Sequence, residues 1–253
     1  MTKQDIYSPG TPCWVDTLQP DPRSALGFYG ALLGWTFDEA VPMPGGLNGE
    51  YFAARVDGRL VAGIGQAPPG SPTVWSTYVG VDEVEQTLAR ATDAGGTVMA
   101  GPLDAGAGGR LAVLADPTGV PFCLWQAGWR PGAELTGSPG TWAMSSLHTP
   151  DVERARTFYG RLFGWELEAV PGAPFSHWRL ADTVVAVVIV TDGVTVPPHW
   201  SVNFAVRDID ATAEEATALG GSVLLEPMDT PGFRNAVIAD PQGGVIAISA
   251  RSS

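Results

Sequence analysis

The sequence predicts an α+β protein in which one arrangement of strand, helix and further strands occurs twice in tandem. The first observation is that residues 27–35 recur as residues 157–165, with Phe-Tyr-Gly, Leu and Gly-Trp at the same places. The second is that Trp-Ser, Gly-Gly and Asp-Pro-x-Gly follow in the same order in both halves, beginning at Trp75, Gly95 and Asp116 and at Trp200, Gly220 and Asp240. The third is length, because 253 residues allow two domains of roughly 120 residues each.

The duplication also predicts the domain boundaries. We place a first domain at residues 8–127, a linker at residues 128–140 and a second domain at residues 141–251. The linker is rich in Gly and Pro, a composition typical of a connecting segment, and it is too short to be a domain.

Each repeat is predicted to open with a strand, at residues 12–18 and 142–148, followed by a helix. Asp21 can accept hydrogen bonds from the free amides of the first helical turn, and Gly34 can adopt the left-handed conformation that ends a helix. Asp151 and Gly164 repeat this arrangement in the second half. Apolar residues at three- and four-residue steps mark the buried face of each helix, and they include Phe28 and Phe158. The Phe-Tyr motif is therefore predicted to be core rather than catalytic.

The remaining runs predict a second helix and further strands in each repeat. Residues 82–94 and 208–219 have helical spacing and end at Gly-Gly. Strands are predicted at residues 51–56, 60–65, 111–115 and 120–126, and at residues 175–180, 184–190, 235–239 and 245–249. Residues 106–109 form a predicted hairpin tip rather than a phosphate loop, because no helix or Lys follows them.

Composition excludes several classes of partner. The net charge is -13 with only 14 Lys and Arg, which disfavours binding to a phosphate backbone. No run of about 18 apolar residues is present to cross a bilayer, and the N-terminus lacks a secretory signal pattern. We expect a cytoplasmic protein, monomeric or homodimeric, that binds neither nucleic acid nor membrane. The two cysteines, Cys13 and Cys123, are expected to be buried free thiols.

The capped helix ending in Phe-Tyr-x-x-Leu-x-Gly-Trp, together with the late Asp-Pro-x-Gly turn, resembles the vicinal oxygen chelate superfamily. That superfamily includes glyoxalase I, bleomycin-binding proteins, fosfomycin-resistance proteins and extradiol dioxygenases. The resemblance covers nearly the whole chain and extends to tandem glyoxalase-like proteins of actinobacteria, some encoded beside polyketide pathways. It implies two glyoxalase-like domains, each built of paired βαβββ modules that form a half-open barrel, or cup.

The resemblance also implies where a metal would bind. Catalytic members usually hold a metal on the cup floor with a His or Gln on the first strand, a His on the strand that opens the second module, and a Glu on the last strand. At the matching positions the first repeat has Trp14, Ser76 and Cys123, and the second has Met144, Ser201 and Ala247. None of these is a dependable ligand for a divalent ion. We therefore expect no metal centre of the usual kind and no other cofactor.

Alternative metal sites need a shift of strand register. Such a shift could bring Cys13 or His199 to a ligand position, but no carboxylate then falls on either last strand. A site made of His148, His177 and a distant carboxylate is a further, less favoured alternative.

Polar side chains on the cup-facing stripes are the candidates for ligand contact, because burying a polar group without a partner costs about 1–3 kcal/mol. By alternation along the strands, Asp16 and His148 face the cups and are the acid–base candidates. An alternative is that Asp16 pairs with an Arg such as Arg55 in an ordinary packed floor. The predicted ligand-binding residues are Trp14, Tyr78, Cys123, Trp125, Met144, Ser146, His177, Asn203 and Asn235. Trp35, Trp75, Trp165 and Trp200 occur in both repeats and are predicted to be scaffold.

The leading functional hypothesis is an enzyme that binds a hydrophobic, aromatic or polyketide-like small molecule and tailors it by lyase- or oxygenase-like chemistry without a conventional metal centre. The first alternative is a protein that sequesters a drug or metabolite without chemistry. The second is a metal-dependent glyoxalase- or dioxygenase-type enzyme whose ligands are displaced from the usual positions.

Overall fold

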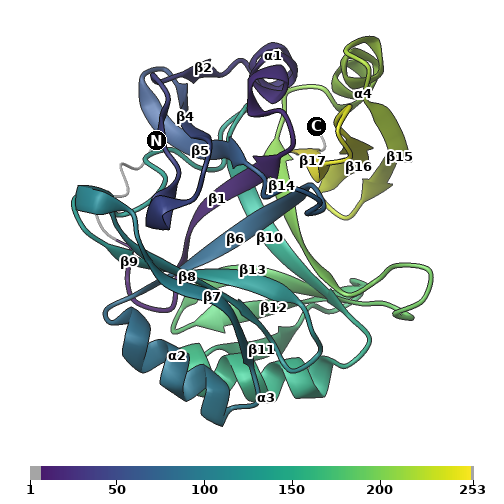
Figure 1. Cartoon of the computed structure of the whole chain (residues 1–253). Coiled ribbons are helices and arrows are strands. Elements are labelled where there is room, and N and C mark those ends of the chain that lie inside the picture. The colour runs from purple at the N-terminus through teal and green to yellow at the C-terminus, as the bar shows by residue number, and fades with distance from the viewer. Residues whose placement is uncertain (1–6, 252–253) are drawn as a thin grey trace.

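Each repeat folds into one curved sheet that carries two helices, as the computed structural model shows for residues 7–251 (Figure 1). Within these residues the strand order is β2-β4-β5-β1-β6-β9-β8-β7 in the first sheet, with β3 beside β4, and β11-β12-β13-β10-β14-β17-β16-β15 in the second. In both sheets the central strand pair is antiparallel, β1 with β6 and β10 with β14. The two βαβββ modules of a repeat therefore meet at the middle of its sheet.

The first repeat contains β1 (Pro12–Gln19), α1 (Pro22–Leu33), β2 (Thr36–Phe37), β3 (Val41–Pro42), β4 (Glu50–Val56), β5 (Arg59–Gln66), β6 (Val74–Val81), α2 (Val84–Asp93), β7 (Thr97–Asp104), β8 (Gly109–Ala115) and β9 (Pro121–Ala127). The second contains β10 (Trp142–Thr149), α3 (Val152–Phe163), β11 (Glu166–Ala169), β12 (Phe175–Leu180), β13 (Thr183–Val190), β14 (His199–Ala205), α4 (Ile209–Ala218), β15 (Ser222–Thr230), β16 (Phe233–Ala239) and β17 (Val245–Arg251). No range was predicted for the central strands β6 and β14 or for the short strands β2, β3 and β11. The edge strands β7 and β15 also lie outside the ranges predicted from the sequence. Exposed polar and apolar residues alternate irregularly in both, because each has a bulged register.

The first helix of each repeat begins and ends as predicted. Asp21 accepts a hydrogen bond from the Ser24 amide at 3.1 Å, and Asp151 accepts one from the Arg154 amide at 3.0 Å. The helices end at Gly34 and Gly164, whose φ angles of 72° and 75° are in the left-handed region that glycine adopts without strain.

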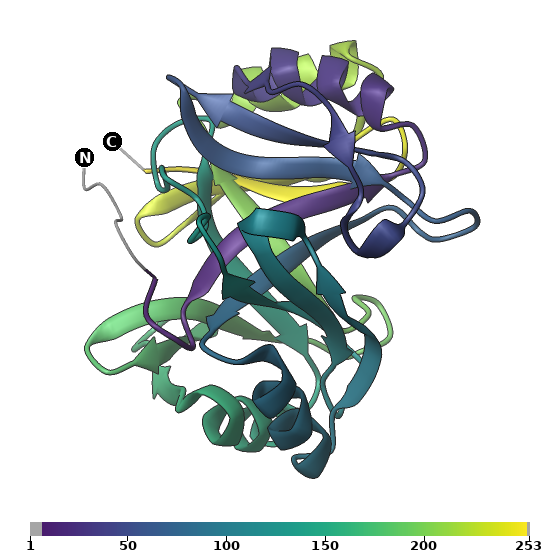
Figure 2. The same ribbon diagram turned by 60° about the vertical axis from the view of Figure 1, so that its left-hand side comes forward.

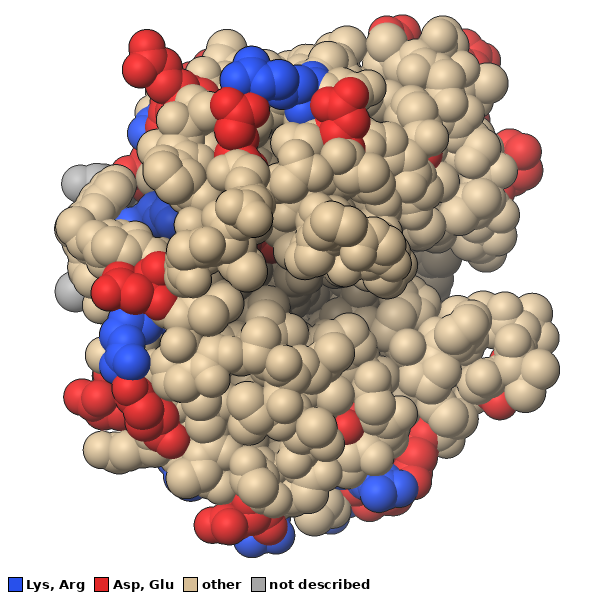
Figure 3. Space-filling view, viewed as in Figure 1, with Lys and Arg blue, Asp and Glu red and all other residues tan. Residues whose placement is uncertain are grey.

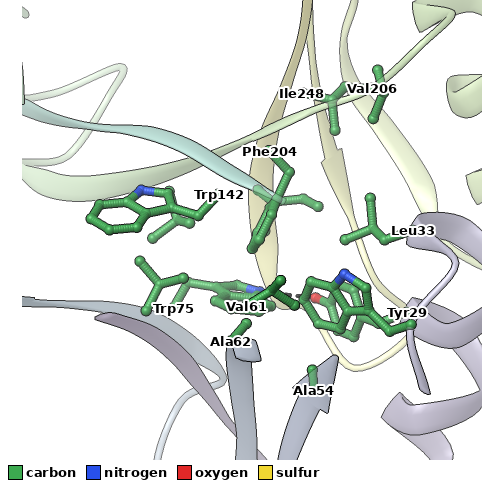
Figure 4. Close-up of a cluster of buried hydrophobic side chains, with 14 of the residues drawn as sticks. Tyr29, Leu33, Ala54, Val61, Ala62, Trp75, Trp142, Phe204, Val206 and Ile248 are labelled. Carbon is green, nitrogen blue, oxygen red and sulfur yellow. Dashed lines mark hydrogen bonds between the residues drawn. The ribbon is translucent and has the colours of Figure 1, made fainter. Parts of the chain in front are cut away.

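The hydrophobic cores join the two repeats crosswise. In one core, α1, β4 and β5 pack with α4 and the strands β14, β16 and β17. Figure 4 shows residues of α1, β4, β5, β14 and β17 in this core. In the other, α2, β8 and β9 pack with α3, β12 and β13. Both views show the resulting helix pairs, α1 beside α4 at one end of the molecule and α2 beside α3 at the other (Figure 2). Each sheet is therefore built from the strands of one repeat, whereas each hydrophobic core is built from residues of both repeats. Neither repeat can bury its helices without the other.

The repeated motifs form the hydrogen bonds of these shared cores. Tyr29 donates to Asp240 at 2.7 Å, and Tyr159 donates to Asp116 at 3.1 Å, so each Phe-Tyr motif binds the Asp-Pro-x-Gly turn of the other repeat. Each tyrosine hydroxyl also accepts from an indole, of Trp75 at 2.9 Å and of Trp200 at 3.0 Å respectively. Trp35 and Trp165 donate to the carbonyls of Gly140 and Gly10, ahead of β10 and β1. These contacts confirm that the Phe-Tyr motif and the four tryptophans are structural.

The segment 128–140 lies against the first repeat. The amides of Ala133 and Glu134 donate to the carbonyls of Cys13 and Leu60, both at 2.8 Å, and the Leu60 amide donates to the Glu134 carboxylate. This segment therefore forms part of the wall of the first cup. Within residues 7–251, no helix is long and apolar enough to cross a membrane.

Candidate functional site

The strand registers show which residues occupy equivalent places in the two cups. Trp14 pairs with Tyr78, which pairs with Cys123, whereas Met144 pairs with Asn203, which pairs with Ala247. In the same way Asp16 corresponds to Ser146, Leu18 to His148, Tyr51 to Phe175, Gly63 to Val187 and Trp125 to Ser249. The cups can therefore be compared position by position.

The first cup is filled by its own aromatic side chains. Trp14, Tyr78 and Trp125 are 4%, 7% and 4% exposed, and Tyr51 is 7% exposed. Tyr51 fits over the floor because β5 carries glycine opposite it, and a Cβ atom at Gly63 would collide with the Tyr51 hydroxyl. These four rings fill the concave side of the first sheet.

Two segments outside the sheet also close the first cup. The loop after β3 inserts Met43, which is 6% exposed, and packs so tightly that a Cβ at Gly45 would lie 2.8 Å from Leu103 of β7. The segment after β9 places the Arg130 guanidinium over both Trp14 and Trp125, with its carbon 5.3 Å from each ring centroid.

Asp16 lies at the bottom of this filled cup and is 3% exposed. Its Oδ2 accepts hydrogen bonds from Tyr78 at 2.9 Å and from Tyr51 at 3.1 Å, whereas its Oδ1 has no hydrogen-bond partner. Burial raises the pKa of this carboxyl from 3.8 to about 6, although the two tyrosines and the charge of Arg130 act in the opposite direction. The alternative pairing with Arg55 is wrong, because Arg55 lies on β4 and binds Asp38.

The second cup has small and polar residues on its floor and is open. Its floor consists of half-buried side chains, including Met144, Ser146, Ser201 and Asn203. Ser249 donates to the Asn203 amide oxygen at 2.6 Å, and Asn235 donates to Thr230 at 2.6 Å. In Figure 3 the surface is hollowed between the β15–β16 side and the segment after β13, and the hollow carries few charged side chains.

His148 stands on the floor of the second cup beside a second imidazole. The rings of His148 and His199 stack with centroids 4.4 Å apart and planes 15° apart. His148 Nε2 lies 3.2 Å from Ser146 Oγ, and His199 Nδ1 lies 2.8 Å from the carbonyl oxygen of Pro197. Burial, and secondarily the charge of His199, lowers the pKa of His148 from 6.5 to about 4, so His148 is neutral near pH 7.

The predicted site residues are thus divided between the two cups. Trp14, Asp16, Tyr78, Cys123 and Trp125 gather in the first cup. The other predicted residues share the open face of the second cup; these are Met144, Ser146, His148, His177, Asn203 and Asn235. The two acid–base candidates, Asp16 and His148, therefore belong to different cups and do not act on one ligand together.

Two residues of the first cup, Tyr51 and Arg130, were missing from the prediction. The glycines at 63 and 65, which alternate along β5, are the sequence signal that would have located Tyr51, because inward glycines mark space for a neighbouring side chain. Arg130 lies in the irregular segment after β9, where no periodicity fixes the direction of a side chain.

The residues at the superfamily's metal positions do not fit a divalent cation. Trp14 is an indole and Ser76 offers only a neutral hydroxyl. Cys123, and Cys13 of the shifted register, are buried thiols whose pKa is raised by burial, which disfavours the thiolate that a metal needs. In the second cup Met144, Ser201 and Ala247 offer no strong ligand. Across residues 7–251, no group of three or more His, Cys, Asp or Glu is placed to hold a metal.

A family model for the glyoxalase-like domain matches residues 14–125 and again residues 144–249. The chain belongs to this family. The two matches coincide with the two sheets, so this tandem member of the vicinal oxygen chelate superfamily carries one glyoxalase-like domain per cup, as the sequence motifs predicted.

Similar full-length proteins come from actinobacteria. The chain is 38% identical to a putative glyoxylase, CFP32, of Mycobacterium tuberculosis over 98% of this chain and 97% of that protein. It is also 38% identical to the anthracycline biosynthesis protein DnrV of Streptomyces peucetius, over 96% of this chain and 94% of that protein.

Solved structures share the fold at low identity. The Mn(II)-bound glyoxalase from Novosphingobium aromaticivorans superposes with a TM-score of 0.65 at 17% identity, covering 95% of this chain and 82% of that one. A 2,2',3-trihydroxybiphenyl 1,2-dioxygenase from Sphingomonas wittichii gives a TM-score of 0.62 at 14% identity, covering 96% and 91%. These similarities confirm the architecture of paired βαβββ modules.

Proposed function

We propose that the second cup binds a hydrophobic, polycyclic aromatic molecule of polyketide type, and that His148 is the acid–base group that acts on it. The proposal rests on the different size of the side chains in the two cups. Equivalent backbone positions hold Trp14, Tyr78 and Trp125 in the first cup and Met144, Asn203 and Ser249 in the second. With every side chain in its observed place, only the second set leaves room for a ligand.

The walls of the second cup suit a flat molecule with oxygen substituents. Phe175, Val187 and Ile189 share the inward face with His148 and offer apolar area, while Leu225 and Met228 extend it across β15. Ser146, Ser201 and Asn203 add polar atoms in a row along the floor. An apolar surface with a few convergent polar groups is the usual composition of a small-molecule site. The similarity to DnrV, a protein named for anthracycline biosynthesis, favours a polycyclic aromatic ligand.

His148 is suited to proton transfer rather than to charge pairing. Because its pKa lies at about 4, the imidazole is unprotonated at neutral pH and available as a general base, but as a weak one, so efficient proton transfer requires that the bound ligand raise this pKa toward neutrality. Ser146 at 3.2 Å can hold one ring nitrogen in place during the transfer. The chemistry proposed here uses the side chains of the chain itself and no conventional metal centre.

Binding is tested with 1,8-dihydroxyanthraquinone, followed by its visible absorbance. Asn203→Tyr and Ser249→Trp import the side chains of the first cup into the second, and each should weaken binding by about tenfold or more, equivalent to roughly 1.4 kcal/mol. Thr183→Trp adds a ring at the exposed start of β13 and is the matched control. Unchanged affinity in Asn203→Tyr would rule out the second cup as the binding site.

Chemistry is tested separately, on whichever bound compound the protein converts. His148→Asn should keep the affinity and lower the rate by about 100-fold or more, the usual range for loss of a general acid–base group. Mass spectrometry that returns every bound ligand unchanged would instead select sequestration. Stoichiometric metal in protein purified without added metal would select the metal-dependent alternative.

A further inference from the structure

The first cup contains an aromatic cage that holds a cation belonging to the chain. The Arg130 guanidinium carbon lies 5.3 Å from the centroids of both Trp14 and Trp125. A cation placed over indole faces is attracted by the ring quadrupole, and the attraction increases when the site is shielded from water. Trp14 and Trp125 are almost fully buried, so this site is shielded.

A buried carboxylate stands next to the cage and lacks a partner. Asp16 projects from the same face of β1 as Trp14, and its Oδ1 accepts no hydrogen bond although the residue is 3% exposed. The charge of Arg130 acts on Asp16, yet Arg130 donates no hydrogen bond to its Oδ1. A buried carboxylate oxygen without a donor is energetically unfavourable, which indicates a place for a donor group that Arg130 does not reach.

A surface cavity lies against Trp125, one of the two rings of the cage. It has a volume of about 220 Å³ and is lined also by Tyr7, Asp82 and Pro131. The Arg130 carbonyl accepts from the Trp125 indole at 2.8 Å, so the backbone can stay in place while the half-buried Arg130 side chain rotates out. The net charge of -13 attracts cations to the molecule as a whole.

We propose that the first cup is a binding site for a small organic cation, an alkylated ammonium or guanidinium compound. In the absence of this cation, the Arg130 side chain occupies the site, and it competes with the cation for binding. In the bound state the cation lies between Trp14 and Trp125 and donates to Asp16 Oδ1, and the Arg130 side chain is displaced toward the surface. The proposal is independent of the function assigned to the second cup.

The test uses the whole chain, removes the Arg130 guanidinium by mutation and supplies a small cation in solution in its place. In Arg130→Ala, methylguanidinium should bind the vacated cage and raise Tm by about 3 °C at ten times its Kd. N-methylurea, its neutral isostere, should not. Arg110→Ala removes the same charge from an exposed ion pair of the same repeat and should not respond to methylguanidinium beyond a sodium chloride control.

Two further measurements decide between a site and a mere packing contact. N-Methylbenzylammonium, which keeps N–H groups to donate to Asp16, should bind the wild-type protein about tenfold more weakly than Arg130→Ala, because it must displace Arg130. The double variant Asp16→Asn/Arg130→Ala should bind both cations about tenfold more weakly than Arg130→Ala.

If Arg130→Ala does not fold, Arg130→Met, which keeps the length of the side chain, takes its place. Equal responses to methylguanidinium and N-methylurea, or no response to either, would overturn the proposal.

Discussion

The first cup carries Trp14, Tyr78 and Trp125 where the second carries Met144, Asn203 and Ser249, on backbones that pair in the same register. The first cup is consequently packed like a protein interior, and the second has a floor of half-buried side chains. By contrast, the motifs that hold the repeats together are alike in the two halves: Tyr29 with Asp240, and Tyr159 with Asp116. Duplication therefore kept the residues that join the repeats, whereas the cup floors, which each repeat builds separately, became different.

The largest effect should come from emptying the first cup. Trp125→Ser places the residue of the second cup into the first, and because the ring is buried we expect a loss of about 3–5 kcal/mol in the free energy of unfolding. Ser249→Ala, at the equivalent place in the second cup, removes one hydrogen bond to Asn203 and should cost about 1 kcal/mol. Urea denaturation measures both, and equal losses would contradict the contrast between a filled and an open cup.

The second prediction concerns the response of the first cup to pH. The folded pKa of Asp16, about 6, exceeds its unfolded value near 3.8, so the folded state holds the proton more tightly. The resulting stability is fully present below pH 3.8 and is lost as pH rises through 6. Relative to Asp16→Asn, the wild-type protein should therefore lose about 2–3 kcal/mol between pH 3.5 and 7. Parallel pH profiles of the two proteins would show that burial does not shift this carboxyl.

The third prediction separates the two joining contacts between the repeats. In Tyr159→Phe, Asp116 Oδ2 loses its hydrogen bond, whereas in Tyr29→Phe, Asp240 Oδ2 keeps a 2.7 Å hydrogen bond from Gln19. Tyr159→Phe should cost about 2–3 kcal/mol and Tyr29→Phe about 1 kcal/mol, because leaving a buried side-chain oxygen without any donor is the larger penalty. Denaturation of the two single variants gives the ranking, and the reverse order would disprove this explanation.

The fourth prediction concerns the acid response of the second cup, and its sign is opposite to that of the first. The folded pKa of His148 is about 4, below its usual value of 6.5, so its contribution is present above pH 6.5 and is lost as pH falls through 4. Proton NMR of the imidazole signals, assigned by their loss in His148→Asn, should show one histidine that titrates below pH 5. A His148 signal that titrates near 6.5 would mean that the cup is more hydrated than its burial indicates.

The sequence by itself determined the duplication, the order of most strands, the helix caps and the family, because these depend on local residue patterns that recur 130 residues apart at Phe28 and Phe158. It also placed Trp14 and Met144 at equivalent inward positions, since side chains alternate strictly along a strand. The edge strands β7 and β15 were not assigned, because their bulged registers break that alternation.

Only the tertiary structure decided which cup is open. Whether a cup is filled depends on the summed volume of side chains from several strands and two loops, including Tyr51, Met43 and Arg130, which are far apart in the sequence. The exchange of core elements between repeats likewise has no local signature, because Tyr29 meets Asp240 across 211 positions of the chain. Local patterns fix the direction of a side chain, but packing between distant segments fixes the space that remains for a ligand.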